Sequence, residues 1–516
     1  MKSLKVLVAI SCLLLILTAC TKEQVMRQAD AVDILLSDQQ IMVAGVAAEA
    51  TPHDGVHVAH DIVYYESGKD FTYGEGALQD AHTAEEADAH TVVHITQPGT
   101  YRLSGKLSRG QIAVDLGEDA KNDPDAVVTL ILDGAEITCE VAPAVIFYRV
   151  YECGDKDEAT KDVDTSAAGA NVIIADGSEN TVTGSYVARI YKPDSVELNK
   201  AGTEVKDAKK LHKYDGAFYS KMSMNITGEK ESTGVLNIYA ENEGLDTEMH
   251  LTLNGGNINI FSGNDGINTN EDGVSVTTVN GGSLNIQVSG QTGEGDGIDS
   301  NGWLVINGGN VFAVACATSM DAGIDSDMGI HINGGTVIAS GHMLDHIEDG
   351  GQTYAVFRFA QEQDGLAAIS LKREDGTALF EHSPCNGYSI LVYSSSVLSE
   401  GSYTLWSGEQ QLTGQSGGLG MPGMMPPSGT EQGQPPQGMT PPEGEMPNGQ
   451  PPQGMEQPGG EMPPTGDTPP KKPDGPHGQG MGPGNMQQWN GAAGERTIAF
   501  VIAEGANMFG GIVPMQ

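Results

Sequence analysis

The chain has 516 residues, a formal net charge of −42, 69 glycines and few aromatic residues. Such an acidic surface repels nucleic acid and attracts cations, so we expect no nucleic-acid partner. The length allows a large core, and the hydrophobic content of only 38% predicts a thin repetitive fold beside a segment that cannot build a core.

The N-terminus has the features of an export signal. Lys2 and Lys5 precede an apolar run over residues 6–17, and the run ends in Leu17-Thr18-Ala19-Cys20, which has the shape of a bacterial lipoprotein cleavage box. We expect residues 1–19 to be removed and Cys20 to be lipidated, which would anchor the protein at the extracellular face of the cell membrane. The alternative is a plain signal peptide with a chance cysteine.

Residues 21–90 are predicted to form an N-terminal segment with an extended, partly irregular course. Its histidines and the one just beyond it are expected to be exposed rather than metal ligands, because no predicted helix aligns them: His53, His57, His60, His82, His90 and His94. Cys139 and Cys153 are near enough in sequence for a disulfide, and they are equally compatible with two buried thiols.

Strand alternation becomes regular at Thr91, and residues 91–349 are predicted to form a repetitive domain. An aliphatic residue followed by Asn-Gly-Gly recurs with spacings of 26, 27 and 26 residues, starting at Asn254, Asn280, Asn307 and Asn333. A period in this range marks a solenoid. After each Asn-Gly-Gly, apolar residues occupy every second position, which is typical of strands with one buried face.

These features predict an all-β fold, a parallel β-helix in which each repeat forms one coil. Stacking the coils at about 4.8 Å would align the four asparagines as a ladder. The same stacking would place Ile258, Leu284, Val311 and Val337 in one aliphatic column inside.

A second motif places acidic residues on both sides of a glycine, as in Asp265-Gly266-Ile267-Asn268 and Asp296-Gly297-Ile298-Asp299. Stacked carboxylates about 5 Å apart repel one another unless a hard cation lies between them, and Ca²⁺ takes six to eight oxygen ligands. The alternative is that these residues only form turns. The candidate calcium ligands are Asp246, Asp265, Asn268, Asn270, Asp272, Asp296, Asp299, Asn301, Asp321, Asp325 and Asp327.

No catalytic residue is predicted. Between Lys230 and Arg358 the chain has no lysine or arginine, so only Lys221, or a residue outside the repeats such as Arg189, could serve as the base of a β-elimination. Acidic residues are so abundant that the sequence selects no pair for hydrolysis. The repeats offer few aromatics for sugar stacking, namely Tyr219, Tyr239, Phe261, Trp303 and Phe312, so a flat aromatic platform is not favoured.

The C-terminal third divides into three parts. Residues 350–411 are predicted to form a small β cap that covers the open end of the solenoid. Residues 412–494 are rich in Gly, Pro and Met and are predicted to be a disordered spacer. Residues 495–516 contain a strand-like stretch that is expected to return and pair with the cap.

Three stretches carry a resemblance to a known family: ITQPGTYRLSG at 95–105, VVTLILDG at 127–134 and DGAFYSK at 215–221. Together with the repeats, they resemble the bacterial carbohydrate-binding domain-containing proteins of clostridia and their relatives, over roughly residues 90 to 410. The resemblance implies a right-handed parallel β-helix that binds calcium and is associated with cellulose and polygalacturonate. It also implies a fold related to calcium-dependent polysaccharide lyases.

The sequence therefore predicts a lipid-anchored lipoprotein that binds a polysaccharide, plant cell-wall or otherwise acidic, without cleaving it and with calcium as cofactor. A calcium-dependent polysaccharide lyase is the first alternative. A surface adhesin or scaffold with a protein partner is the second. The oligomeric state stays open.

Overall fold

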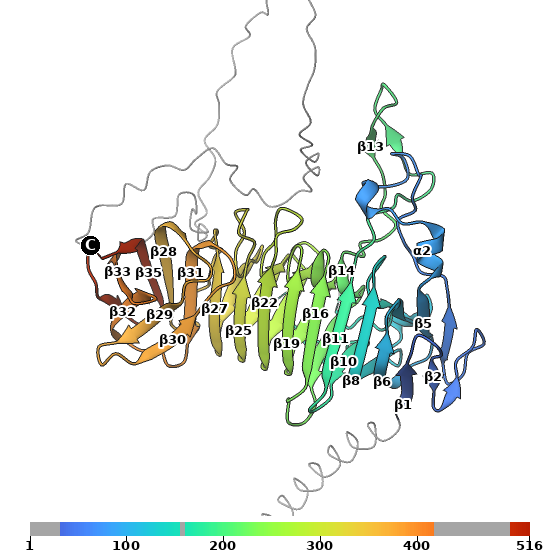
Figure 1. The fold of residues 1–516 in the computed structure, drawn as a ribbon, viewed down its shortest axis with the longest axis horizontal. Coiled ribbons are helices and arrows are strands. Elements are labelled where there is room, and N and C mark those ends of the chain that lie inside the picture. Colours follow the sequence, from blue (N-terminus) through green and yellow to red (C-terminus); the bar gives the residue numbers. More distant parts are fainter. Residues whose placement is uncertain (1–30, 155–159, 417–495, 516) are drawn as a thin grey trace, which may run out of the picture. The chain divides into compact units, whose positions relative to one another are not determined.

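The computed structural model describes residues 31–154, 160–416 and 496–515, all within one compact unit (Figure 1). Nearly all regular structure in these residues is β-strand. The helical elements described are the short α2 (Ala84–Asp88) and the single turns η1 (Leu78–Asp80) and η2 (Ala120–Asn122). The predicted all-β class is confirmed. Cys20 and residues 417–495 lie outside the described residues.

Most strands belong to three ladders of parallel strands, and successive stretches of chain add one strand to each ladder in the same order. Residues 224–247 supply β15 (Met224–Gly228), β16 (Val235–Ala240) and β17 (Glu243–Thr247). The next stretch supplies β18 (Leu251–Leu253), β19 (Asn257–Ser262) and β20 (Ile267–Thr269), which pair in parallel with β15, β16 and β17 respectively. Each repeat therefore places equivalent residues side by side.

The strands of the three ladders are as follows. The first ladder contains β6 (Gly99–Leu107), β8 (Val128–Cys139), β10 (Ala170–Ile174), β15, β18 (Leu251–Leu253), β21 (Val276–Val279), β24 (Trp303–Ile306) and β26 (Gly329–Ile332). The second continues from β6 and β8 through β11 (Glu179–Gly184), β16, β19 (Asn257–Ser262), β22 (Ser283–Val288), β25 (Asn310–Val314) and β27 (Thr336–Gly341). The third contains β5 (Thr91–Ile95), β7 (Gly110–Asp115), β9 (Val145–Arg149), β14 (Gly216–Ser220), β17, β20 (Ile267–Thr269) and β23 (Ile298–Ser300), and β4 (Val56–Ala59) pairs antiparallel with β5 at its edge.

The core is built from the predicted aliphatic column. Ile258, Leu284, Val311 and Val337 are register partners on β19, β22, β25 and β27, and each is at most 2% exposed. Their burial follows from the strand alternation, because every second side chain points to the same face.

The predicted asparagine ladder is confirmed. Each Asn side chain donates from Nδ2 to the Oδ1 of the preceding one, at 2.9 Å from Asn280 to Asn254, 2.9 Å from Asn307 to Asn280 and 2.8 Å from Asn333 to Asn307. The second glycine of each motif lies in the left-handed region; Gly282 has φ +84°, and a Cβ there would collide with the carbonyl oxygen of Gly256. Only glycine fits this turn without strain.

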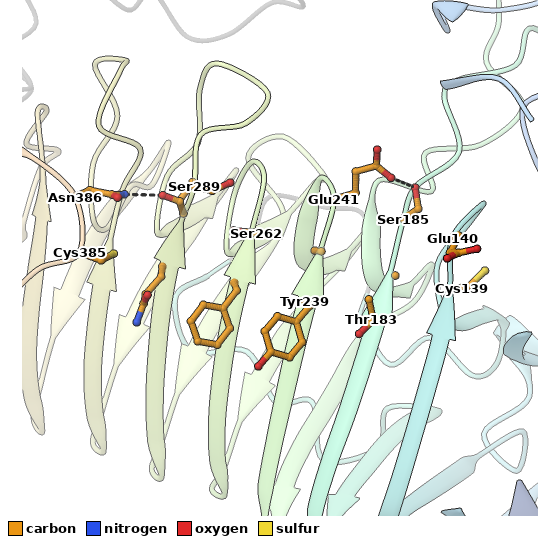
Figure 2. A pocket seen from close by; sticks show the side chains of 15 residues that line it. Cys139, Glu140, Thr183, Ser185, Tyr239, Glu241, Ser262, Ser289, Cys385 and Asn386 are labelled. Carbon is orange, nitrogen blue, oxygen red and sulfur yellow. Dashed lines mark hydrogen bonds between the residues drawn. The ribbon is translucent and has the colours of Figure 1, made fainter. Parts of the chain in front are cut away.

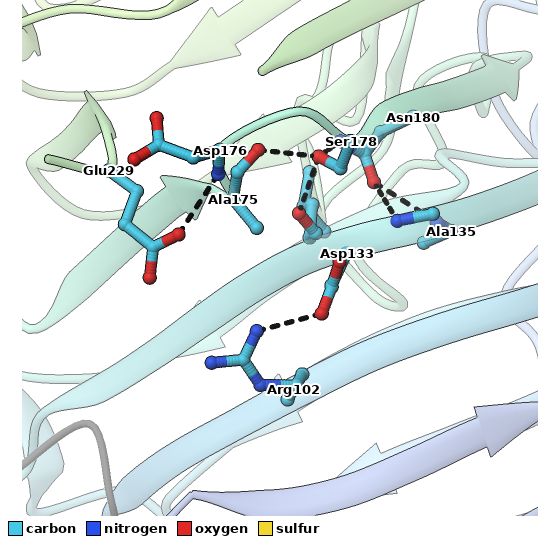
Figure 3. Close-up of polar contacts among 10 residues, drawn as sticks. Arg102, Asp133, Ala135, Ala175, Asp176, Ser178, Asn180 and Glu229 are labelled. Carbon is cyan, nitrogen blue, oxygen red and sulfur yellow. Dashed lines mark hydrogen bonds and ion pairs between the residues drawn. The ribbon is translucent and has the colours of Figure 1, made fainter. Parts of the chain in front are cut away.

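The corner between the first two ladders is closed by a buried asparagine (Figure 3). Asn180 Oδ1 accepts hydrogen bonds from the backbone N–H groups of Gly134 (2.9 Å) and Ala135 (3.0 Å), where β8 bends from one ladder to the next. Its Nδ2 donates to Ser178 Oγ at 2.7 Å. The backbone groups left without ladder partners at the bend are thereby satisfied.

The N-terminal segment is more regular than its sequence indicates. β1 (Val32–Leu36) pairs in parallel with β6 and is followed by the short strands β2 (Met42–Val43) and β3 (Val46–Ala47). The expectation that all its histidines are exposed is wrong for His90, which is 2% exposed. Its ring nitrogens contact the carbonyl oxygen of Glu86 (2.8 Å) and the backbone N–H of Glu140 (3.3 Å), so the ring joins two segments.

The lysine-rich stretch after Tyr191 forms an insertion with a small hairpin, β12 (Glu197–Leu198) and β13 (Val205–Asp207). Cys139, Cys153, Cys316 and Cys385 are all free, so Cys139 and Cys153 form no disulfide. In the part of the chain that the structure describes, no helix is long and apolar enough to cross a membrane.

A C-terminal β unit ends the parallel stacking. β31 (Tyr388–Ser395) pairs antiparallel with β27, the last strand of the second ladder, and with β28 (Tyr354–Gln363). β29 (Ile369–Arg373) and β30 (Ala378–His382) form a hairpin, and β32 (Gly401–Ser407) pairs with β29. This unit has its own apolar cluster, centred on Phe357, Leu405 and Phe500.

The C-terminal strands return to this unit as predicted. β34 (Phe500–Ile502) pairs with β32, and β35 (Ala506–Pro514) pairs with β28 and with β33 (Gln410–Ser416). The predicted start of the spacer at residue 412 is wrong, because β33 spans Gln410–Ser416. Leu412 is only 1% exposed and belongs to the apolar cluster, so the cap extends to Ser416.

Candidate functional site

Oxygen-bearing side chains are stacked along the third ladder. Asp246, Asn268 and Asp299 are register partners on β17, β20 and β23. The residue before each of them, Leu245, Ile267 or Ile298, is fully buried in the core. Because side chains alternate along a strand, the three polar residues lie together on the opposite face of the same ladder.

Backbone hydrogen bonds extend this stacking to the turns on both sides. At the start of the strands, Gly244 N–H donates to Asp265 O and Gly266 N–H to Asp296 O, each at 3.0 Å. At the end of the strands, Asn270 N–H donates to Thr247 O at 2.8 Å and Asn301 N–H to Thr269 O at 3.0 Å. The side chains at the first, fourth and sixth positions of the acidic motif, such as Asp265, Asn268 and Asn270, therefore form three neighbouring columns.

These side chains are shielded from water. Asp246 is 0% exposed, Asp265 and Asn268 are 8% exposed, and Asn270 is 7% exposed. Burial of a carboxylate disfavours its charged form, and a nearby like charge disfavours it further.

The pKa values of the stacked carboxyl groups are accordingly raised. Burial, and next to it the charge of Glu243, holds the pKa of Asp246 well above its usual range. Burial and the charge of Asp327 raise the pKa of Asp299 to about 7. The column is thus electrostatically unfavourable when all its carboxylates are ionised.

Two more carboxyl groups on this corner behave in the same way. Burial and the charge of Asp299 hold the pKa of Asp265 well above its usual range. Burial and the charge of Asp345 raise the pKa of Asp325 to about 8.

Several buried side-chain oxygens in this cluster accept no hydrogen bond from the residues that the structure describes, although their neighbours are hydrogen-bonded. Asn270 Nδ2 donates to Asp246 Oδ1, and Asn268 Nδ2 donates to Glu243 Oε1 at 3.2 Å. Asp246 Oδ2, Asn268 Oδ1 and Asn264 Oδ1 are buried and have no hydrogen-bond partner among the described residues. A buried oxygen without a partner costs about 1–3 kcal/mol.

This donor set fits a hard cation. Calcium takes carboxylate, amide and carbonyl oxygens, which are the groups that the corner presents. In the described residues, no three His, Cys, Asp or Glu side chains are already gathered as a metal site. In the middle column the amide of Asn268 lies between the carboxylates of Asp246 and Asp299, so the amide oxygen of Asn268 is also a candidate ligand.

The predicted ligands do not all lie in the buried part of the corner. Asp246, Asp265, Asn268, Asn270, Asp296, Asp299 and Asp325 are brought together along it. Asp272 and Asp327 are exposed; Asp272 accepts a hydrogen bond from Asn301 Nδ2 at 3.2 Å. Asp321 accepts hydrogen bonds from Ser319 Oγ and from Gly295 N–H (2.5 Å), so it holds a loop.

Three further residues belong to the corner and were not predicted as ligands: Glu243, Asn264 and Asp345. Glu243 opens the first acidic motif, and Asn264 directly precedes the second, so the repeat alone could have identified both. Asp345 follows the last repeat, and its carboxylate accepts a hydrogen bond from Ser326 N–H at 3.1 Å. Only the folded chain brings it to Asp325.

Basic side chains lie at the beginning of the acidic corner. Arg189 Nη2 is 2.8 Å from Asp215 Oδ2, and the charges of Asp215 and Glu243 raise the pKa of Arg189 against the effect of its burial. A guanidinium held in this way remains protonated and is unsuited to act as a base. Lys221 follows β14 directly and is exposed.

Fold and site together define an all-β protein of stacked parallel strands with a buried, oxygen-rich corner. The family described as carbohydrate-binding domain-containing protein matches residues 89–352, just over half of the chain. The chain therefore belongs to this family.

A relative and a solved structure are similar to parts of the chain. A carbohydrate-binding domain-containing protein of Acetivibrio thermocellus is 28% identical over 168 residues, which is 33% of this chain and 44% of that protein. The chain thus matches less than half of the relative's length. A gadolinium derivative of a polysaccharide lyase-like protein from C. thermocellum covers 59% of this chain and 92% of its own, with 18% identity and a TM-score of 0.32.

Proposed function

We propose that this protein is a lipid-anchored carbohydrate-binding protein that uses calcium and does not cleave its ligand. Membership of the carbohydrate-binding domain-containing family supports the ligand class. The anchor would be a lipid on Cys20 at the extracellular face of the membrane, as the cleavage box predicts. We also propose that the three ladders are the faces of a right-handed parallel β-helix.

One observation carries the calcium proposal. Asp246 and Asn268 are register partners on adjacent strands, and each keeps one buried side-chain oxygen without a hydrogen-bond partner among the described residues. Asp265, Asp296, Asp299 and Asp325 would supply further oxygens along the same corner. Bound calcium would neutralise the repulsion between these carboxylates and hold neighbouring repeats in register.

The test is a retention experiment with the full-length chain in mild detergent. The chain is passed through gels containing polygalacturonate or a neutral glucan, once with calcium and once with a chelator. The same incubations are read for the ultraviolet absorbance of unsaturated uronides. Retention that requires calcium, without new absorbance, is the expected result. No retention on either polymer would refute carbohydrate binding.

A lyase remains the second candidate because of Lys221. On the paired strands β14 and β17, Ser220 lies opposite Thr247. The next residue along each strand is Lys221 or Glu248, so Lys221 lies beside Glu248 at the start of the acidic corner. A lysine beside bound calcium is an arrangement that could abstract a proton from a uronate. New absorbance that disappears in Lys221→Ala would establish this alternative.

A further inference from the structure

A groove of about 510 Å³ lies on the outer face of the second ladder, on a different ladder from the acidic corner (Figure 2). It crosses β11, β16, β19 and β22, and residues Cys385 and Asn386 of the cap line one end of it. Its volume is within the range of small-ligand sites, about 300–1,000 Å³.

The floor of the groove carries a pair of aromatic rings. Tyr239 and Phe261 are register partners on β16 and β19, with ring centroids 5.1 Å apart and planes inclined by only 9°. Tyr239 is 43% exposed. Their register neighbours on either side, Thr183 and Gln287, carry no ring. The pair therefore offers an uncovered aromatic surface of the kind that the apolar face of a pyranose packs against.

Two other aromatic residues of the repeats, Tyr219 and Phe312, do not offer such a surface. Tyr219 is fully buried and donates to Glu248 Oε1 at 2.8 Å. Phe312 stacks on His382 of the cap, with centroids 5.7 Å apart.

Hydrogen-bonding groups surround the ring pair. Gln287 and Ser289 are exposed in the groove, and Thr183 is half-buried. An apolar floor with several hydroxyl and amide groups at its edge suits a sugar, which has an apolar face and a rim of hydroxyls.

The charge of the residues that line the groove favours a neutral sugar over an acidic one. The charged side chains among the lining residues are Glu140 and Glu241, and no lysine, arginine or histidine belongs to the lining. Glu241 accepts a hydrogen bond from Ser185 Oγ at 2.6 Å. A uronate would meet like charge here and find no cation, whereas a neutral sugar can donate its hydroxyls to these carboxylates.

The cap completes the site. Asn386 Nδ2 donates to the backbone carbonyl oxygens of Val288 (2.5 Å) and Ala315 (2.7 Å), at the ends of β22 and β25. These bonds fasten the cap loop to the second ladder at the end of the groove. The loop lies beyond residues 89–352, the part that the family matches, so this wall is a feature added outside the family domain.

We propose that the groove is the sugar-contacting site, that it takes a neutral pyranose chain, and that the cap loop at Asn386 closes its end. This inference rests on the proposed function and deepens it. Tyr239 and Phe261 supply the stacking surface, and the calcium proposed for the third ladder keeps the repeats in register without touching the sugar.

The test uses the full-length chain with calcium, in gels containing either hydroxyethylcellulose as the neutral glucan or polygalacturonate. Tyr239→Ala and Phe261→Ala should each weaken retention on the neutral glucan at least tenfold, and Tyr239→Phe should restore it. Phe71→Ala is the matched control, because Phe71 is 49% exposed but lies outside the groove. The thermal midpoint and its rise with calcium should be those of the wild type in every variant.

Asn386→Ala tests the wall. It should weaken retention on the neutral glucan about threefold, with an unchanged thermal midpoint. A wild type that binds the neutral glucan while Tyr239→Ala and Phe261→Ala bind it equally well would overturn the assignment. So would a wild type retained only by polygalacturonate, although carbohydrate binding would then stand. If the wild type binds neither polymer, the inference and the proposed function both fail.

Discussion

Asp246 and Asn268 lie opposite each other on the paired strands β17 and β20, and each has one buried side-chain oxygen with no hydrogen-bond partner among the described residues. The second oxygen of Asp246 accepts from Asn270, and the amide nitrogen of Asn268 donates to Glu243. The two remaining oxygens are thus fixed in place by their own neighbours. This arrangement supports the proposed cation site, because side chains that only formed a turn would bond to nearby backbone instead.

Removal of calcium should destabilise the protein. A ligand that binds only the folded state adds about 2.7 kcal/mol to the free energy of unfolding at a concentration of 100 times its Kd. Thermal unfolding with 1 mM calcium and with a chelator measures the difference, and magnesium is the control ion because it demands a smaller, octahedral site. Equal midpoints in all three solutions would contradict the calcium proposal.

Asp246→Asn should separate the two roles of this carboxylate. In the chelator, the variant should be more stable than the wild type by roughly 1–2 kcal/mol, since a buried charge is removed while the shape is kept. In calcium it should lose most of the stabilisation that calcium gives to the wild type. Asp272→Asn is the matched control, because Asp272 is exposed and should change neither value appreciably.

His212 should make stability depend on pH. Its ring is 7% exposed and stacks on Tyr214 at 4.4 Å, and neither ring nitrogen has a hydrogen-bond partner among the described residues. Burial lowers the pKa of His212 to about 4; the nearby charge of Asp215 opposes this shift, and that of Arg189 adds to it. The unfolded chain therefore binds a proton below about pH 6.5 that the folded chain takes up only near pH 4.

It follows that the free energy of unfolding falls as the pH drops from 6.5 to 4, by up to roughly 3 kcal/mol from this residue. His212→Phe keeps the stacking and should remove this part of the pH dependence. The quantity to measure is the difference between variant and wild type at each pH, because the contribution of the acidic corner then cancels. A difference that is constant from pH 7 to pH 4 would show that His212 is not buried in its neutral form.

Two glycines test the close contact between repeats. Gly282 and Gly273 both have positive φ, +84° and +68°, but a Cβ at Gly273 would meet no atom within 4 Å, whereas one at Gly282 would collide with the carbonyl of Gly256. Gly273→Ala should lower the free energy of unfolding by about 1–2 kcal/mol, because an alanine is strained in the left-handed backbone conformation. Gly282→Ala should lower the free energy of unfolding by clearly more, because the backbone of the preceding repeat must also move. Equal losses of stability in urea unfolding would mean that neighbouring repeats pack less tightly at this turn.

The repeat itself explains why much of the fold could be predicted from the sequence. Asn254 and Asn280 are 26 residues apart with the same neighbours, so one periodic rule gives their ladder, the aliphatic column and the acidic columns together. Asn386 follows no such rule. It contacts Val288 across 98 residues of sequence, and no local pattern marks the contact. The pairing of Tyr239 with Phe261 was missed because Tyr239 precedes the first Asn-Gly-Gly motif, where the repeat length differs.

The return of the C-terminal strands makes a prediction about the segment between them. Gly414 and Thr497 exchange two backbone hydrogen bonds, of 3.0 and 2.9 Å, and Ser416 lies opposite Phe509. The two borders of residues 417–495 are therefore adjacent, and a short linker can join them. Replacing these roughly 80 residues by about eight Gly and Ser residues should stabilise the cap by about 2 kcal/mol, because the shorter loop loses less entropy on closure.

Phe500→Ala is the companion variant, because Phe500 packs edge-on against Phe509 at 5.1 Å inside the cap cluster. Phe500→Ala should lower the free energy of unfolding by about 3–5 kcal/mol, both in the natural chain and in the variant with the short linker, since it leaves a cavity in the core of the cap. If the short linker instead lowers the thermal midpoint while Phe500→Ala behaves as expected, residues 417–495 contribute contacts of their own to the folded cap. The predicted role of these residues as a spacer would then be wrong.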